Sequence, residues 1–289
     1  MAGGSMKGIK TRIRSMENTK QITKAMEMVA SSKLRKAQAR VIAARPYFET
    51  LYSTLQEIAN GTEGFSSPFF EKREIRHSCY IVIAGDRGLA GGYNANVLRL
   101  AQSEMAGKDP YILPLGKRTV EFAKKHGLPF VAEDYAEAED VSVGDCFTAA
   151  KTVTKEFIEG RYDEVYVIYT EFRSILSQVP VMRKLLPLDE EMIHSGKGAD
   201  PQLMNPGMVL YEPGPDEVFE AIIPEYLGGV IYGSLCESVA AEQGARRTAM
   251  EAATDNAEEM IENLSLLYNR ARQGAITQEI TEIVAGANQ

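Results

Sequence analysis

The feature that most constrains the fold is the stretch from Leu235 to Val284, near the C-terminal end of the sequence. It contains no proline, and small or apolar residues recur in it at steps of three and four. One helical face defined by this spacing carries Ala245, Ala249, Ala253, Asn256, Met260, Leu264, Leu267 and Ala271. At about 1.5 Å per residue, such a helix is roughly 75 Å long. A compact domain does not need a helix of this length, so the pattern predicts an equally long partner.

The N-terminal part of the chain supplies that partner. From Ile9 to Ile58 only Pro46 interrupts a second helical pattern, and we expect this proline to kink or bend the helix. The apolar face carries Met26, Ala30, Leu34, Ala37, Val41, Ala44, Phe48, Leu51, Leu55 and Ile58. Ile9, Ile13 and Met16 form a similar stripe, but residues 18–21 interrupt it, so the seam is expected to change its face there.

The charges of the two terminal segments are opposite in sign. Residues 1–60 carry eleven Lys and Arg against four Glu, which gives +7, and residues 216–289 carry four Arg against thirteen Asp and Glu, which gives −9. Two long amphipathic helices of opposite charge predict an antiparallel coiled-coil shaft built from residues 1–60 and 210–289. Its alanine-rich seam should be thin and in need of support from a surrounding partner. The alternative is that each helix packs separately on a globular core.

Residues 61–209 between these helices have a different character. Short apolar runs predict strands at Ser78–Ala84, Tyr111–Leu115, Phe130–Val131 and Glu164–Thr170, with an edge strand at Val179–Leu186. Helical patterns alternate with them at Asn94–Met105, Thr119–His126 and Gly144–Glu159. This alternation predicts a central, doubly wound, Rossmann-like α/β domain. His194–Pro206, rich in glycine and proline, is expected to be a mobile loop.

The loop from Gly85 to Asn94 stands where α/β folds bind phosphates, after the first strand and before a helix. Its glycines match neither GxGxxG nor GxxxxGK[ST], and the acidic residue expected about 20 positions later is absent. We therefore favour a tight structural turn over a nucleotide site. The residues expected to build the turn are Asp86, Arg87, Gly88, Gly91 and Gly92.

The remaining sequence features do not indicate catalysis. Cys79, Cys146 and Cys236 are widely separated, which favours buried thiols over a disulfide or zinc site. The three histidines have no ligand-type neighbours, and no nucleophile motif is present. The net charge of −8 argues against nucleic-acid binding, and no signal peptide or membrane-spanning run is evident. The sequence thus predicts a non-catalytic protein without a metal or cofactor.

Polar clusters on the long helices are candidates for partner contacts, although each could simply be a solvated helix face. Lys33, Arg35 and Lys36 form one cluster, and Arg246–Arg247 forms another. Near the C-terminal end, Arg270–Glu279 places several hydrogen-bonding side chains on one helical surface with little apolar anchor. Such a surface suits reversible contact.

Four motifs resemble the gamma subunit of bacterial F-type ATP synthase: ITKAMEMVASSKLRKAQ at 22–38, GDRGLAGGYN at 85–94, AATDNA at 252–257 and NRARQGAITQEITEIV at 269–284. The resemblance implies a central rotor shaft inside a ring of three alpha and three beta subunits. It also implies an α/β domain near the epsilon subunit and the c-ring. ATP sites would belong to alpha and beta, and the chain would sit on the cytoplasmic face of the bacterial plasma membrane, peripherally and only through the complex. Its implied role is to couple ion translocation to ATP synthesis or hydrolysis.

The resemblance also implies roles for particular residues. Met26, opposite Arg246, would meet the beta subunits, and Lys33, Arg35 and Lys36 would face acidic beta levers. Further along, a polar catch for beta would consist of Arg272, Gln273, Thr277 and Glu279. Tyr211 and Glu212 would form a foot on the c-ring. The sequence departs from the family pattern at Gly85, where a hydroxyl residue is usual, and at Gly274, which costs roughly 1 kcal/mol of helix propensity.

Two other hypotheses remain open from the residues alone. A nucleotide-dependent α/β enzyme with helical arms would bind a nucleotide saturably, which calorimetry on the purified chain would detect. A purely structural coiled-coil scaffold would form a stable homo-oligomer and would have no affinity for ATPase subunits.

Overall fold

A computed structural model describes residues 6–62, 67–132, 137–189 and 211–287. The chain divides into two compact units. The first consists of Met1–Ser31 with Arg246–Gln289, and the second of Ser32–Ala245. Two long helices, α1 (Met6–Gly61) and α6 (Pro215–Ala287), contribute to both units. The predicted loop at His194–Pro206 lies outside the described residues.

The second unit is built around a mixed four-stranded sheet in the order β2-β1-β3-β4. Strand β1 (His77–Ile83) is central and pairs in parallel with β2 (Asp109–Leu115) and with β3 (Glu164–Phe172). The edge strand β4 (Gln178–Leu186) pairs with β3 in the antiparallel sense. The four principal predicted strands are confirmed, including the edge position of the last.

The fifth predicted strand, at Phe130–Val131, is wrong. This segment forms only an isolated parallel bridge between Phe130 and Ile112. The Ile112 amide donates to the Pro129 carbonyl, and the Val131 amide donates back to Ile112. Pro129 has no amide hydrogen with which to extend this ladder.

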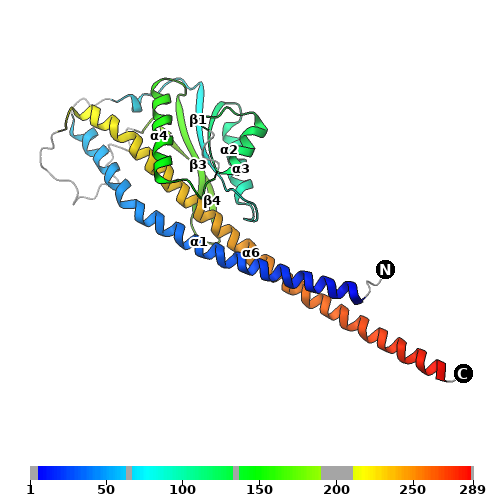
Figure 1. Cartoon of the computed structure of the whole chain (residues 1–289). Helices are drawn as coiled ribbons and strands as arrows, with labels where there is room; N and C mark the ends of the chain where they lie inside the picture. The colour runs from blue at the N-terminus through cyan, green and yellow to red at the C-terminus, as the bar shows by residue number, and fades with distance from the viewer. Residues whose placement is uncertain (1–5, 63–66, 133–136, 190–210, 288–289) are drawn as a thin grey trace. The chain divides into compact units, whose positions relative to one another are not determined.

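Helices cover both faces of the sheet (Figure 1). On one face, Tyr80 and Val82 of β1 pack with α2 (Tyr93–Met105) and α3 (Lys117–His126). On the other, Cys79, Ile81 and Ile83 pack with α4 (Val143–Ile158) and with parts of α1 and α6. A short 3₁₀ helix, η1 (Pro68–Phe70), closes this larger core. The alternation follows from the two-residue period of a strand, and it confirms the layered α/β architecture.

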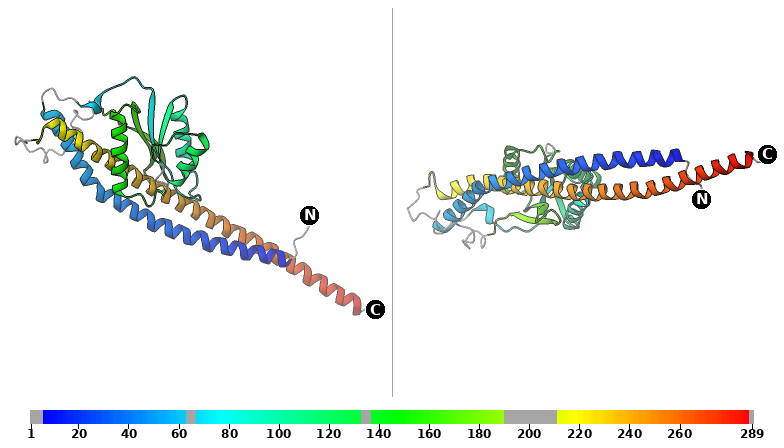
Figure 2. Two further views of the ribbon diagram at one scale, coloured as in Figure 1. Left: turned by 45° about the horizontal axis from the view of Figure 1, so that its top comes forward. Right: turned by 90° about the horizontal axis from the view of Figure 1, so that it is seen from below.

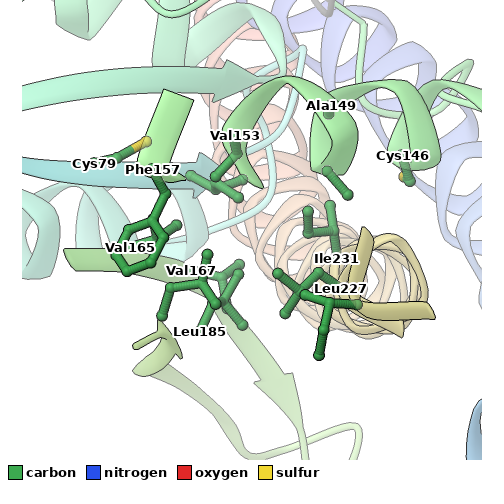
Figure 3. Packing of buried hydrophobic residues seen from close by; sticks show 14 of the residues in the cluster. Cys79, Cys146, Ala149, Val153, Phe157, Val165, Val167, Leu185, Leu227 and Ile231 are labelled. Carbon is green, nitrogen blue, oxygen red and sulfur yellow. The ribbon is translucent and has the colours of Figure 1, made fainter. Parts of the chain in front are cut away.

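The larger core joins α4, the sheet and α6 through apolar side chains. Figure 3 shows Val153 and Phe157 of α4, Val167 of β3 and Ile231 of α6 within one packed cluster. Along α6, fully buried residues recur every four positions: Phe219, Ile223, Leu227, Ile231 and Leu235. A helix that buries this many apolar side chains is held by tertiary packing more than by propensity.

Helix α6 begins at Pro215, within the predicted shaft segment 210–289 and twenty residues before the proline-free stretch that starts at Leu235. Pro224 lies inside it, and Gly228 and Gly229 follow. These glycines are required by packing, because a Cβ on Gly228 would lie 3.0 Å from the Phe147 Cα, and one on Gly229 would lie 1.9 Å from the Phe48 ring. The two glycines, a residue type that usually weakens a helix, therefore allow Phe147 and Phe48 to approach the α6 backbone closely. Pro46 lies within α1, which runs from Met6 to Gly61 without a break.

In the first unit, α1 and α6 run antiparallel, side by side (Figure 2). The Thr23 and Thr254 hydroxyls form a buried hydrogen bond of 2.7 Å, and Lys20 forms an ion pair with Glu258. The predicted change of face at residues 18–21 is wrong. Lys20 is half-buried and Thr23 buried, so the three-four spacing that starts at Ile9 continues without a shift. Paired polar groups replace apolar ones in this part of the seam.

The predicted seam of α6 is also partly wrong. Asn256, Met260 and Leu267 are exposed. The most buried face is centred instead on Met250, Thr254, Ala257, Ile261, Leu264, Tyr268 and Ala271, and the predicted Ala245, Ala249 and Ala253 are half-buried beside it. This face keeps a seven-residue repeat, which is typical of two helices that pack along their length. On α1, by contrast, all of the predicted seam residues from Met26 to Ile58 are buried or half-buried.

Candidate functional site

The crevice in which an α/β fold usually binds a ligand lies in the second unit, at the carboxyl ends of β1 and β3. The chain leaves β1 towards β2 on one side, and β3 lies on the other side. Such a reversal of strand order opens a crevice between the two following loops. What occupies this crevice decides whether a ligand can enter.

Asp86, in the loop after β1, binds backbone amides of its own chain. Its carboxylate accepts hydrogen bonds from the amides of Lys117 and Ala138, both at 3.0 Å, and from Glu139 at 3.4 Å. Asn94 closes the loop by accepting from the Gly85 amide at 2.8 Å and donating to the Arg87 carbonyl at 3.0 Å. These contacts give the loop a structural task, because its polar groups are bound to the protein itself.

The loop glycines have local roles. Gly91 has a φ of +55°, which favours glycine, and Gly92 immediately precedes α2. Gly88 and Arg87 are exposed. Leu89 is a non-glycine residue at φ +63° whose side chain is 65% exposed. Sequence reasoning did not single out this leucine.

Helix α6 fills the crevice. The Ser238 hydroxyl lies 2.8 Å from the Tyr93 hydroxyl and accepts from the Thr170 amide at 3.4 Å. Ala241 is fully buried against Tyr93 and Phe172, which flank the crevice on its two sides. The space that a nucleotide would need is therefore occupied by the protein's own helix.

Glu242 completes this packing beside Gly85. The residue is 3% exposed, and its carboxylate would lie 2.8–2.9 Å from a Cβ placed on Gly85. This contact gives a physical reason for glycine at a position where a hydroxyl residue was expected. A small side chain could fit only if the Glu242 carboxylate moved aside.

The first basic cluster is split between contact with the protein and exposure. The Lys33 ammonium donates to both carboxylate oxygens of Glu139, at 2.6 and 2.9 Å. Gln243 of α6 donates to the same carboxylate at 2.9 Å. Arg35 and Lys36 are exposed. Sequence reasoning missed Glu139, because no spacing along the chain links it to residues 33 and 243.

The last part of α6 extends beyond the N-terminal end of α1 (Figure 2). Every residue from Arg272 to Ala285 is exposed, and this includes Gln273, Thr277 and Glu279. The Thr277 hydroxyl donates to the Gln273 carbonyl at 2.9 Å. Exposed apolar side chains accompany these polar groups: Ile276, Ile280, Ile283 and Val284. This segment therefore exposes more apolar surface than we expected from the sequence, which predicts a mainly polar catch.

Met26 lies level with Glu251 of α6. The pair Thr23–Thr254 sets the register, and three residues along α1 correspond to three residues back along an antiparallel α6. Arg246 lies five residues further on, about 7.5 Å along the axis of an ideal helix, and its place opposite Met26 stays a prediction. Met26 is half-buried, but the neighbouring Ile22 and Val29 are about 60% and 56% exposed. Spaced at i, i+4 and i+7, the three form an apolar stripe that borders the seam, with Met26 at the seam and Ile22 and Val29 exposed beside it.

Comparison with known proteins identifies the family. A family model described as ATP synthase matches residues 5–289. The ATP synthase gamma chain of Ruminococcus albus is 45% identical over 284 residues, 96% of each chain. That of Alkaliphilus metalliredigens is 43% identical over 286 residues, which is 99% of this chain and 98% of the relative. The chain belongs to the ATP synthase gamma family.

The fold agrees with this membership. A chain in the cryo-EM structure of the Euglena gracilis mitochondrial ATP synthase rotor superimposes with a TM-score of 0.63 at 18% identity. The match covers 95% of this chain and all of that one. A gamma chain is a stalk subunit and not itself the catalytic one, which accords with a ligand crevice filled by its own helix.

The two residues expected to form a foot for a gamma subunit, Tyr211 and Glu212, lie just before α6. Tyr211 is half-buried against the larger core, and burial, with a smaller contribution from Glu57, raises the pKa of its hydroxyl. Glu212 is exposed. The two side chains thus differ, one packed on the domain and one directed to solvent.

Other reactive groups in this gamma-family chain are buried or dispersed. Burial raises the pKa of the Cys146 thiol to about 12 and also raises those of Cys79 and Cys236. All three are buried free thiols. Among the described residues, no cluster of His, Cys, Asp or Glu could hold a metal ion. No helix in the same residues is long and apolar enough to cross a membrane.

Proposed function

We propose that this gamma-family chain is the central rotor shaft of an F-type ATP synthase. In this proposal α1 and α6 form an antiparallel coiled coil that turns within three alpha and three beta subunits. The α/β domain attaches the shaft to the epsilon subunit and the c-ring. Rotation then couples ion translocation to ATP synthesis or hydrolysis.

The observation that carries the proposal is the use of α6 in two places. In the second unit α6 occupies the crevice that an α/β enzyme would keep open, through Ser238, Ala241 and Glu242. In the first unit its residues from Arg272 to Ala285 are all exposed. A helix that closes a potential active site and then extends as an unpaired end is suited to mechanical transmission and unsuited to catalysis.

The exposed surfaces supply the contacts that a rotor needs. Beta-subunit contacts are assigned to Met26, Lys33, Arg35, Lys36, Arg246, Arg272, Gln273, Thr277 and Glu279. The exposed Ile276 among the last four, with Ile280 and Ile283 just after them, supplies apolar area, which binds more strongly than polar heads alone. Tyr211 and Glu212 are assigned to the c-ring. The chain would thus lie peripherally on the cytoplasmic face of the plasma membrane, held there by the complex.

Coexpression with alpha and beta subunits tests the proposal. We expect a complex that contains this chain and hydrolyses ATP, whereas the chain alone should neither bind nor hydrolyse ATP. Size-exclusion chromatography with an ATPase assay measures both. Failure of the wild-type chain to enter such a complex would sink the proposal, and saturable ATP binding to the chain alone would favour the enzyme hypothesis.

A further inference from the structure

Three elements of the second unit meet at the carboxylate of Glu139. Lys33 of α1 donates to both of its oxygens, at 2.6 and 2.9 Å, and Gln243 of α6 donates to one of them at 2.9 Å. Glu139 itself lies on the segment before α4. The carboxylate thus ties both long helices to the α/β domain at one level.

The backbone fixes Glu139 in this position. The Asp86 carboxylate accepts from the amides of Ala138 and Glu139, and the Asp140 amide closes a turn onto the Glu137 carbonyl. The Glu139 side chain is therefore presented to Lys33 by an ordered turn. This arrangement reduces the entropy that an ion pair between two long side chains usually costs.

The ion pair remains open to competition. The Lys33 side chain is 45% exposed and that of Glu139 is 38% exposed. A pair exposed to this extent contributes little to stability and is screened by salt. A partner surface that carries several carboxylates can therefore exchange with the single carboxylate of Glu139, especially since Arg35 and Lys36 beside Lys33 are also exposed.

We propose that Glu139 is a positioning residue that holds the Lys33 ammonium in the free chain and releases it to an acidic partner surface on assembly. The proposal rests on the proposed function, because the partner surface belongs to the subunits that surround the shaft. Gln243 keeps its hydrogen bond to Glu139 after release, so the domain stays attached to α6 while α1 presents its full basic cluster.

Carbodiimide crosslinking tests the ion pair, because the reagent joins an amine to a carboxylate in direct contact. In the free full-length chain we expect a Lys33–Glu139 amide, detected by peptide mass spectrometry. Glu139→Gln should abolish it, whereas Glu137→Gln, an exposed glutamate two residues away, should retain it. Lys36 on the same helix should form no link to Glu139. A free chain without the Lys33–Glu139 link would overturn the proposal.

The same crosslink measures release. In the complex with alpha and beta subunits, its yield should fall about two- to fivefold, the range that a partly exposed ion pair supports. Glu139→Gln should slow dissociation of the chain from the complex by a similar factor, and Glu137→Gln should not. An unchanged yield in an assembled complex would refute release while leaving the rotor function intact. If wild-type chain forms no complex, the proposed function fails and the release step fails with it, whatever the free chain shows.

Discussion

At the scale of single residues, substitutions at two glycines with positive φ distinguish the cost of backbone strain from the cost of a steric clash. Gly116 has φ +98°, and a Cβ there would lie 2.0 Å from the Ala84 carbonyl oxygen. Gly107 has φ +76° and open space around it. Gly116→Ala should therefore lower the free energy of unfolding by more than about 3 kcal/mol, whereas Gly107→Ala should cost about 1 kcal/mol. Urea unfolding followed by circular dichroism measures both.

The control in this pair is Gly107→Ala, which carries the strain without the clash. Equal losses for the two variants would mean that the chain relaxes around Ala84, and the argument for a close approach of the two loops would be wrong.

Asp86 is the second residue whose role can be measured alone. Asp86→Ala leaves the amides of Lys117, Ala138 and Glu139 without this acceptor. We expect a loss of about 1–3 kcal/mol in urea unfolding. Faster hydrogen exchange at Ala138 should accompany it. Asp140→Ala, an exposed neighbour, is the matched control. Similar values for both variants would contradict the assignment of Asp86 as the residue that secures the turn.

At the scale of elements, the sequence predicted the strands and short helices well because their apolar periods are local. The errors concern the long helices, where the position of the other helix determines which face is buried. On α6 two adjacent faces both carry small residues, so Met250, Thr254 and Ala257 could not be distinguished from Ala249, Ala253 and Asn256 without the position of α1. The buried Thr23–Thr254 bond, a polar pair from opposite ends of the chain, could not be predicted from either segment alone.

The close packing of the first part of α6 against α4 gives a prediction for two glycines on one helix. A Cβ on Gly228 would meet the Phe147 ring at 2.2 Å and its Cα at 3.0 Å, whereas Gly233 has nothing within 4 Å. Gly228→Ala should destabilise the chain by about 1–3 kcal/mol. Gly233→Ala should stabilise it by roughly 0.5–1 kcal/mol through helix propensity. Thermal unfolding compares them, and the same sign for both changes would contradict the close packing of α4 on α6.

At the start of α4, the Asp145 carboxyl makes a contribution to stability that depends on pH. The Ser142 side chain and backbone both donate to Asp145, which holds the pKa of this carboxyl below its usual 3.8. A carboxylate with a lowered pKa in the folded state stabilises above the unfolded value and loses this effect as pH falls through the folded value. Asp145→Asn should therefore cost about 1 kcal/mol at pH 7 and nothing once the pH is well below 3.8.

Urea unfolding of wild type and Asp145→Asn at several pH values measures this difference. Asp140→Asn, which removes a nearby exposed carboxylate, should show no comparable gap at pH 7. The Ser142 hydroxyl also accepts from the Asp145 amide, so the two residues cap the start of α4 reciprocally. If the difference in unfolding free energy between wild type and Asp145→Asn stayed constant into strong acid, this cap would not act through the ionised carboxylate.

At the scale of the whole molecule, the candidate site could be predicted only in part. Motifs at residues 22–38 and 269–284 predict the partner-binding segments, and these assignments stay predictions because the surfaces that they would meet lie outside the chain. The filled crevice was not predictable, since it depends on Ser238 and Glu242 meeting loops about 150 residues earlier in sequence. The same holds for Glu139 and Lys33, which only the fold brings together.

The exposed end of α6 gives the prediction that distinguishes assembly from stability. A chain that ends at Ala271 loses residues 272–285, which are all exposed, together with the last four residues, so its thermal unfolding midpoint should stay within about 2 °C of wild type. Its complex with alpha and beta subunits should nevertheless dissociate faster, because Ile276, Ile280 and the polar side chains around them are lost.

Within the full chain, Arg272→Ala with Gln273→Ala should weaken the complex. The matched pair Gln278→Ala with Glu282→Ala, which removes a hydrogen bond internal to the helix, should weaken it less. Dissociation followed by size-exclusion chromatography ranks these variants. If the complex retained the truncated and wild-type chains equally, the main contact with the surrounding subunits would lie elsewhere on the shaft, on the stripe of Ile22, Met26 and Val29.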